Sequence, residues 1–151
     1  MRSRGARFFF FPLLAAVTAT RSGRKPSPKK VLVIEAGAGE ITRRTIEESF
    51  DRRVAVTTMP FHQLAGKPLE AGAIAGKEFD IIFINGTHTL SEKDISRTAL
   101  LLTREGVAQN RIIIAVKKEE VARAAIKEGF RAVGPDAYGS YIDALAAMIE
   151  R

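Results

Sequence analysis

Three stretches of the chain are almost wholly apolar, and each has the length of a single strand. They are residues 31–35, 81–84 and 112–116, which read VLVIE, IIFI and IIIAV. A strand with one face in water alternates between apolar and polar residues, whereas an unbroken apolar run is typical of a strand covered on both faces in a parallel sheet. Residues 53–58 alternate more and predict an edge strand, and residues 131–134 predict a short last strand.

Segments with helical periodicity follow these strands. The expected helices are 40–50, one that begins at Pro68, one capped by Ser91 and ended by Gly106, 117–128 and 138–150. The side chains expected to face the sheet are, helix by helix, Ile41, Ile46 and Phe50; Leu69, Ala73 and Ile74; Ile95, Ala99 and Leu102; Val121, Ala124 and Ala125; and Ile142, Leu145 and Ile149. Residues 59–67 are expected to form a loop.

Strands and helices that alternate in this way predict a single α/β domain over residues 31–151. One edge-like strand and three central ones fit a doubly wound, parallel, five-stranded sheet in the order 2-1-3-4-5, the flavodoxin-like arrangement. In such a sheet, ligands bind at the carboxyl ends of the first and third strands. The residues that we expect to border this crevice are Gly37, Gly39, Asn85, Gly86, Thr87 and His88, with Gly134 and Pro135 farther along the same edge.

The turn Gly37-Ala38-Gly39 lies between a strand and a helix, so its backbone N–H groups could hold a phosphate. It lacks the third glycine of the dinucleotide-binding pattern G-x-G-x-x-G, because position 42 is a threonine. A strand-to-helix turn that needs a positive φ is the plainer interpretation, and it is the one that we favour.

Thr87-His88-Thr89 places two hydroxyl groups around an imidazole. His88 could act as a base, a proton donor or a weak candidate metal ligand, but no carboxylate near it in the sequence would orient it for catalysis. A surface-loop histidine without a catalytic task is the interpretation that we favour. Asn85 stands where receiver domains of this topology carry the phosphate-accepting aspartate. Because an amide is not a nucleophile for phosphate, phosphotransfer is not expected.

The composition excludes several kinds of site. The chain has no cysteine, so disulfides, thiolate catalysis and thiolate metal sites are ruled out, and two histidines cannot form a zinc site without carboxylates. Residues 1–30 hold eight basic side chains and no acidic one, which leaves 16 of the 24 basic residues and all 17 acidic ones in the domain, a net charge of −1. The domain lacks the positive charge of a nucleic-acid-binding face, so we expect no nucleic-acid partner.

Residues 1–30 have the composition of a targeting leader and linker. They are rich in arginine, and their apolar run of ten residues from Phe8 to Val17 is too short to span a bilayer, which takes about 20 residues. A mitochondrial presequence has this composition, whereas a secretory signal would need small residues at its cleavage site, which Val17-Thr18-Ala19 could supply. Basic residues beyond the apolar run favour import into the mitochondrial matrix, with secretion as the alternative.

Short motifs lie near the ends of several predicted strands and helices: Pro60-Phe61-His62-Gln63, Pro68-Leu69-Glu70-Ala71, His88-Thr89-Leu90, Lys127-Glu128-Gly129-Phe130 and Val133-Gly134-Pro135-Asp136. In these motifs the chain resembles the cobalamin-binding domain of methylmalonyl-CoA mutase and its relatives. That family has a Pro-Leu-Phe-Gln-like loop, a His-Lys-Thr-Leu-like segment after the third strand and a Phe-Gly-Pro-Gly-Thr loop near its end. The resemblance covers roughly residues 30–151 and implies the flavodoxin-like fold, with cobalamin as a ligand to consider.

The chain departs from that family at its cobalamin-binding positions. The family ligates cobalt through the histidine of Asp-x-His-x-x-Gly after the first strand, and residues 36–42 (AGAGEIT) contain no histidine. Its Ser-x-Leu after the third strand, which lines the slot for the nucleotide tail, is Asn85-Gly86-Thr87 here, and its Gly-Gly after the fourth strand is Val116-Lys117. The resemblance therefore implies a degenerate member that keeps the fold and has lost base-off cobalamin binding.

Together these observations predict a non-catalytic, cobalamin-binding-domain-like module without a cofactor. We expect it to be a subunit or assembly partner of a mitochondrial complex, so its partners would be other proteins. A cobalamin-carrying subunit beside a separate mutase subunit is one alternative. A nucleotide- or CoA-phosphate-binding enzyme that uses the turn at Gly37–Gly39 is another.

Overall fold

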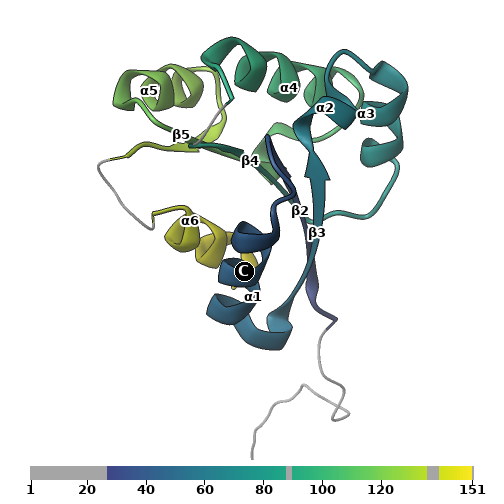
Figure 1. Cartoon of the computed structure of the whole chain (residues 1–151), viewed down its shortest axis with the longest axis vertical. Coiled ribbons are helices and arrows are strands. Elements are labelled where there is room, and N and C mark those ends of the chain that lie inside the picture. The colour runs from purple at the N-terminus through teal and green to yellow at the C-terminus, as the bar shows by residue number, and fades with distance from the viewer. Residues whose placement is uncertain (1–26, 88–89, 136–139, 151) are drawn as a thin grey trace, which may run out of the picture.

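The computed structural model describes residues 27–87, 90–135 and 140–150. Parallel strands form one five-stranded sheet in the order β3-β2-β4-β5-β6 (Figure 1). Their bounds are β2 (Lys29–Glu35), β3 (Val54–Pro60), β4 (Ile81–Gly86), β5 (Ile112–Val116) and β6 (Arg131–Val133). In chain order this is the predicted arrangement 2-1-3-4-5, so the flavodoxin-like fold expected from the unbroken apolar runs is confirmed.

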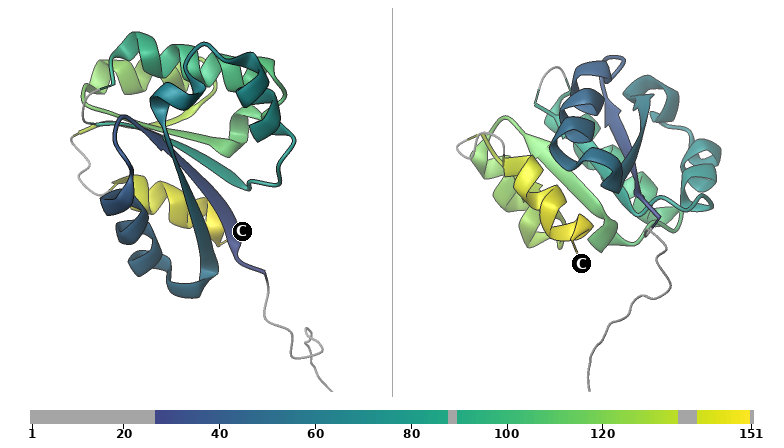
Figure 2. Two further views of the ribbon diagram at one scale, coloured as in Figure 1. Left: turned by 45° about the vertical axis from the view of Figure 1, so that its right-hand side comes forward. Right: turned by 90° about the horizontal axis from the view of Figure 1, so that it is seen from below.

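Helices cover both faces of the sheet, as a doubly wound fold requires (Figure 2). One face carries α1 (Glu40–Phe50) and α6 (Ser140–Ile149); the other carries α2 (Phe61–Leu64), α3 (Pro68–Ala75), α4 (Glu92–Arg104) and α5 (Glu119–Lys127). Two short 3₁₀ turns, η2 (Asp51–Arg53) and η3 (Gln109–Arg111), lead into β3 and β5. None of the helices in the described part of the chain has the length and apolar composition that crossing a membrane requires.

The core has two layers because successive side chains of a strand point to opposite faces of the sheet. In β4, Ile82 and Ile84 pack toward α2–α5, whereas Ile81 and Phe83 pack toward α1 and α6. All four side chains are buried, with at most 1% of their surface exposed. Phe83 also stacks on Tyr141 of α6, with ring centroids 5.1 Å apart. A central strand therefore needs apolar residues at every position, which is the pattern that its sequence shows.

Several predicted helix ends are correct. The Ser91 hydroxyl caps α4 by accepting a hydrogen bond from the Asp94 backbone N–H at 3.1 Å, and Pro68 occupies the first turn of α3. Gly106 follows α4 with a φ of 114°, a conformation that favours glycine. The predicted loop at 59–67 is wrong in part, because the strand continues to Pro60, opposite Glu35, and α2 forms directly after it.

Four side chains predicted to face the sheet do not. Ile41 is 83% exposed and Leu69 88% exposed, and Ala73 and Ala124 are exposed as well. The buried stripe of α1 runs through Thr42, Ile46 and Phe50 at i, i+4 and i+8, and this places Ile41 about 100° away from Thr42 around the helix. In α3 and α5 the buried positions include Ala71 and Ala122 instead. In α1 the prediction overlooked a threonine, and in α3 and α5 it chose an alanine two positions away from the one that is buried.

Candidate functional site

The crevice predicted between the first and third strands lies where β2 and β4 end. These strands are neighbours in register, with Ile34 opposite Ile84, so the next residues of each strand, Glu35 and Asn85, meet at the carboxyl edge of the sheet. The Asn85 Nδ2 donates to Glu35 Oε2 at 2.9 Å and to Thr42 Oγ1 at 3.3 Å, and the Thr42 hydroxyl donates to Glu35 Oε2 at 3.2 Å. We call these three residues the Glu35–Thr42–Asn85 cluster.

All three members of the cluster are buried, with 6%, 8% and 6% of their surfaces exposed. The other end of the Asn85 amide is occupied too, since its Oδ1 accepts from the Thr87 backbone N–H at 3.2 Å and from the Thr87 hydroxyl at 2.7 Å. Buried polar groups are costly unless they have partners. Here the partners come from the chain itself, so the polar atoms of the cluster are engaged with one another and tie α1 to the end of β4.

The chemistry of this cluster is narrow. It contains a single carboxylate, and no lysine or arginine forms an ion pair with Glu35 in the part of the chain that the structure describes. Across residues 27–87, 90–135 and 140–150, no three histidine, aspartate or glutamate side chains gather as metal ligands would. The cluster thus supplies neither an acid/base pair nor a metal site from the described residues.

The glycine turn before α1 is shaped by close packing. Gly39 has a φ of 76°, and a Cβ added there would lie 3.0 Å from both Glu35 Oε1 and the Thr58 side chain. A Cβ added at Gly37 would have no atom within 4 Å, and Gly37 has no positive φ. The need for a positive φ therefore holds at Gly39 alone, where the turn brings the backbone against the buried carboxylate.

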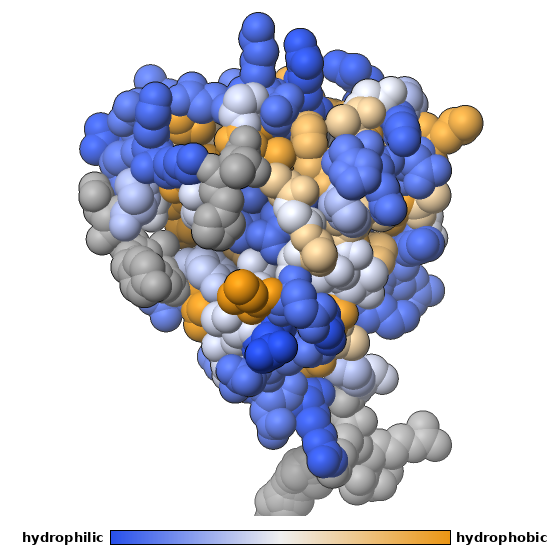
Figure 3. Space-filling model, in the orientation of Figure 1, coloured by the Kyte–Doolittle hydropathy of each residue, from blue (hydrophilic) through white to orange (hydrophobic). Residues whose placement is uncertain are grey.

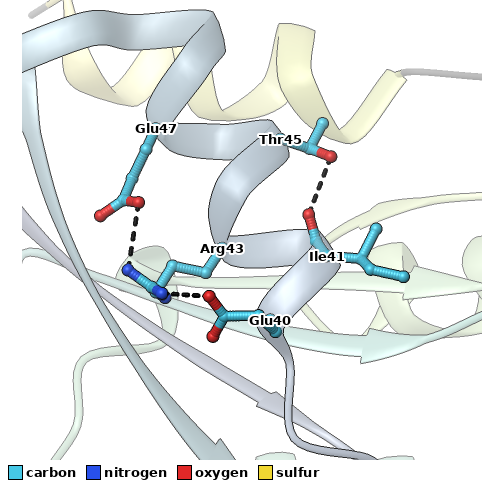
Figure 4. Close-up of polar contacts among 5 residues, drawn as sticks. All are labelled: Glu40, Ile41, Arg43, Thr45 and Glu47. Atoms are coloured by element: carbon cyan, nitrogen blue, oxygen red, sulfur yellow. Dashed lines mark hydrogen bonds and ion pairs between the residues drawn. The ribbon is translucent and has the colours of Figure 1, made fainter.

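The same turn is a poor place for a phosphate. Glu35 lies beneath it, and Glu40 adds a second carboxylate in the first turn of α1. Figure 4 shows that Glu40 and Glu47 both point to Arg43, on the side of α1 opposite to Ile41. Hydrogen bonding to Glu40, reinforced by the charges of Glu40 and Glu47, raises the pKa of Arg43. The guanidinium of Arg43, near the start of α1, is therefore engaged by carboxylates.

The remaining predicted site residues lie at different distances from the cluster. Gly86 ends β4 next to Asn85 and packs so tightly that an added Cβ would lie 2.2 Å from Ile95 Cδ1 and 2.9 Å from the Ala115 carbonyl oxygen. Gly134 and exposed Pro135 follow β6, two strands away from β4, and Gly134 packs against Glu119 of α5 instead. His88 lies outside the described residues.

Two members of the cluster were missed as site residues from the sequence. Glu35 was taken only as the end of an apolar run, and Thr42 only as the residue that replaces a third glycine. A signal did exist, because a glutamate that directly continues the buried run VLVI must find a partner or leave the core. The sequence does not show that this partner is an asparagine 50 residues farther on.

Replacing Asn85 with aspartate is expected to lower the free energy of unfolding by about 3 kcal/mol at pH 7, because a donor to Glu35 becomes a second buried carboxylate. Urea denaturation at pH 7 and pH 4.5 measures the loss. It should shrink at the lower pH, where protonation of one carboxyl relieves the repulsion, and on addition of Mg²⁺, which oxygen ligands of this kind bind.

Asn85→Leu is the matched control for that substitution, since it removes the amide without adding a charge. The loss of stability caused by Asn85→Leu should be the same with and without Mg²⁺. Equal stability of Asn85→Asp and the wild type at pH 7 would contradict the role given to the Asn85 amide.

Comparison with known proteins supports the fold but identifies no family. No protein-family model matches the chain. No curated protein matches it in sequence. A crystal structure from Burkholderia pseudomallei, of a protein provisionally described as pilus assembly-related, is similar with a TM-score of 0.55 and 17% sequence identity over 86% of this chain and 96% of that one. At this level of identity the similarity establishes a shared α/β fold, in agreement with the flavodoxin-like strand order.

Proposed function

We propose that the protein is a non-catalytic flavodoxin-like module that acts as a subunit or assembly partner of a larger complex. One observation carries the proposal: at the crevice that folds of this type use for ligands, the polar atoms of the Glu35–Thr42–Asn85 cluster are already hydrogen-bonded to one another. A domain whose polar groups at the usual ligand site are paired with one another would act through its outer surface, by contact with other proteins.

The residues present do not fit a base-off cobalamin. Such a complex needs a histidine after β2, small residues after β4 and glycines after β5. Residues 36–42 contain no histidine, the Asn85 side chain is held by Glu35 and Thr87, and Val116 is buried at the end of β5, where the first glycine would stand. These features support the first proposal over the cobalamin-carrying alternative.

The phosphate-binding alternative is also disfavoured. Glu35 and Glu40 flank the N–H groups at the start of α1, and a phosphate there would be repelled by both carboxylates. The similar protein from B. pseudomallei is itself provisionally described in terms of assembly, a role of the kind that we propose here. The basic, acid-free composition of residues 1–30 supports placing the complex in the mitochondrial matrix.

Cobalamin binding is tested on the full-length protein by titration with hydroxocobalamin and adenosylcobalamin, followed by visible spectra and calorimetry. We expect no change in the cobalamin spectrum and no heat of binding. A micromolar complex that disappears in His88→Ala would overturn the proposal in favour of a cobalamin carrier.

The assembly itself is tested by fractionating native extracts by size. The endogenous protein should elute at an apparent molecular mass well above that of the monomer. In high salt or mild urea it should elute as a monomer. A protein that elutes as a monomer in freshly prepared extract would contradict the proposal. The matrix location is tested separately by fusing residues 1–30 to a fluorescent protein. A diffuse cytosolic signal would contradict the proposed location and leave the proposed assembly role untouched.

A further inference from the structure

Asn85 is followed directly by a glycine, the pairing in which an asparagine loses its side-chain amide most easily. In deamidation, the main-chain nitrogen of the next residue attacks the side-chain carbonyl carbon of the asparagine. Gly86 carries no side chain that would hinder this approach. The other asparagine of the chain, Asn110, is followed by Arg111. In the unfolded chain, Asn85 is therefore the asparagine that should react first.

The fold holds the Asn85 amide at both ends. Its Nδ2 donates to Glu35 Oε2 and Thr42 Oγ1, and its Oδ1 accepts from the backbone N–H and the hydroxyl of Thr87. Asn85 and Gly86 also belong to β4 and are paired in register with β5. The reaction closes a five-membered ring, which needs a turn of the main chain at Asn85, whereas a strand is extended. Deamidation of the folded protein therefore has to wait until the carboxyl end of β4 opens.

The reaction needs only water and hydroxide. Hydroxide takes the proton of the Gly86 main-chain nitrogen, and this nitrogen attacks Asn85 Cγ. A bond forms between that nitrogen and Cγ, the bond from Cγ to Nδ2 breaks, and Nδ2 leaves as ammonia after taking a proton from water, which regenerates hydroxide. Water then opens the succinimide. Attack of water at Cγ gives an aspartate at position 85, and attack at the main-chain carbonyl carbon of that residue gives an isoaspartate.

Both products conflict with the folded structure. An aspartate at position 85 lacks the Nδ2 donor and places a second carboxylate beside that of Glu35, where each of the two native side chains has only 6% of its surface exposed. An isoaspartate also carries a negative charge, and it lengthens the main chain of β4 by one carbon atom. The extra atom disturbs the register with β5, in which Asn85 lies opposite Ala115.

We propose that Asn85-Gly86 is a site of spontaneous deamidation, which the intact fold suppresses and which prevents the chain from refolding once it has occurred. The modification thus marks chains whose β4 end has opened and removes them from the folded population. The inference goes beyond the proposed function, because it concerns the lifetime of the domain and holds with or without a partner protein.

The reaction is followed on the full-length protein in mildly alkaline buffer, with and without urea, by mass spectrometry of its peptides. In urea, Asn85 should react much faster than Asn110, and Gly86→Ala should slow Asn85 because its β-carbon hinders the attacking nitrogen. Without urea, Asn85 should react at least about tenfold more slowly than in urea, since a strand end must first open. Asn110, which is exposed, should change far less. Equal rates at Asn85 in the two conditions would overturn the inference.

Thr42→Val tests whether the cluster provides the protection. It removes the hydroxyl that accepts from Asn85 and donates to Glu35, and the easier opening should raise the rate at Asn85 in the native protein by about fivefold. Thr98→Val is the matched control, because it removes another buried threonine hydroxyl, one that donates to the Asp94 carbonyl oxygen within α4. It should leave the rate at Asn85 nearly unchanged. If the two variants react equally fast, the cluster does not control the reaction and the inference fails.

The effect of the modification is measured on protein that was deamidated in urea, returned to buffer and separated by charge from unmodified protein. Hydrophilic side chains are prominent on the surface of the folded domain in Figure 3, whereas all six positions of β4 are buried. The modified fraction should therefore bind a dye for exposed apolar surface and should unfold at a lower urea concentration. A modified fraction with the urea midpoint of unmodified protein would refute the second half of the proposal.

Glu35→Gln isolates the role of the second carboxylate. In Glu35→Gln/Asn85→Asp, one carboxylate and one amide face each other again, with their positions exchanged. Its urea midpoint should lie above that of Asn85→Asp, because the carboxylate at position 85 regains an amide donor. A midpoint no higher than that of Asn85→Asp would show that the paired carboxylates are not what prevents refolding, contrary to the inference.

Discussion

Ile113→Asp should prevent the protein from folding. Ile113 lies in the middle of β5 with 0% of its surface exposed and packs toward α1 and α6. Loss of its side chain and burial of an unpaired carboxyl together cost about 5 kcal/mol or more, and domains of this size have a total stability of about 5–15 kcal/mol. We expect the variant in the insoluble fraction after expression, without a cooperative thermal transition in any soluble remainder.

Ile82→Asp tests the opposite face of the sheet, because Ile82 packs toward α2–α5. It should fail in the same way. Thr57→Asp is the control, since it introduces the same side chain at an exposed position of the edge strand β3 and should leave a soluble, folded protein. Soluble and cooperatively folding Ile113→Asp would contradict the assignment of β5 as a strand covered on both faces.

Gly86→Ala is expected to lower the free energy of unfolding by about 3 kcal/mol, at the upper end of the range for overpacking. The added Cβ would lie 2.2 Å from Ile95 Cδ1 and 2.9 Å from the backbone carbonyl oxygen of Ala115. The isoleucine side chain can turn away, but the carbonyl belongs to the neighbouring strand. Removing the Ile95 side chain should therefore relieve only part of the clash. A double-mutant cycle with Gly86→Ala, Ile95→Ala and the double variant, measured by urea denaturation, should show a coupling energy smaller than the loss caused by Gly86→Ala alone.

Gly37→Ala is the control for that substitution. A Cβ added at Gly37 would meet open space, and the residue has no positive φ, so the change should be neutral or stabilise the protein by up to about 1 kcal/mol through the unfolded chain. If Gly86→Ala were as stable as Gly37→Ala, the close contact between β4, β5 and α4 would be disproved.

The sequence allowed the candidate site to be located but not its internal structure to be foreseen. The positions of Gly39, Asn85 and Gly86 at the carboxyl edge followed from the alternation of strands and helices, since parallel strands all end at the same edge. The hydrogen bonds from Asn85 to Glu35 and Thr42 join residues 50 and 43 positions apart. Local patterns carry no information on such pairs, because they depend on how neighbouring strands are set in register.

The cavities between α4 and α5, which share Glu92, Ile95 and Val121 as lining residues, are a second feature that the periodicity did not reveal. Ile95, Ala99 and Val121 were predicted to face the sheet, and a side chain that faces the sheet also borders any gap left beside its helix. Whether such a gap is filled depends on the spacing of the two helices and on the size of their side chains. Both are properties of the assembled layers and not of either helix.

By itself, the sequence determined the class and order of the fold. Apolar runs without a break require cover on both faces, and for β2, β4 and β5 the helices on either side of the parallel sheet provide it. The tertiary structure alone decided which helix faces are buried and that the Asn85 amide donates a hydrogen bond to Glu35. The physical reason is that periodicity is a local property of the chain, whereas burial and hydrogen bonding are settled by contacts between residues far apart in sequence.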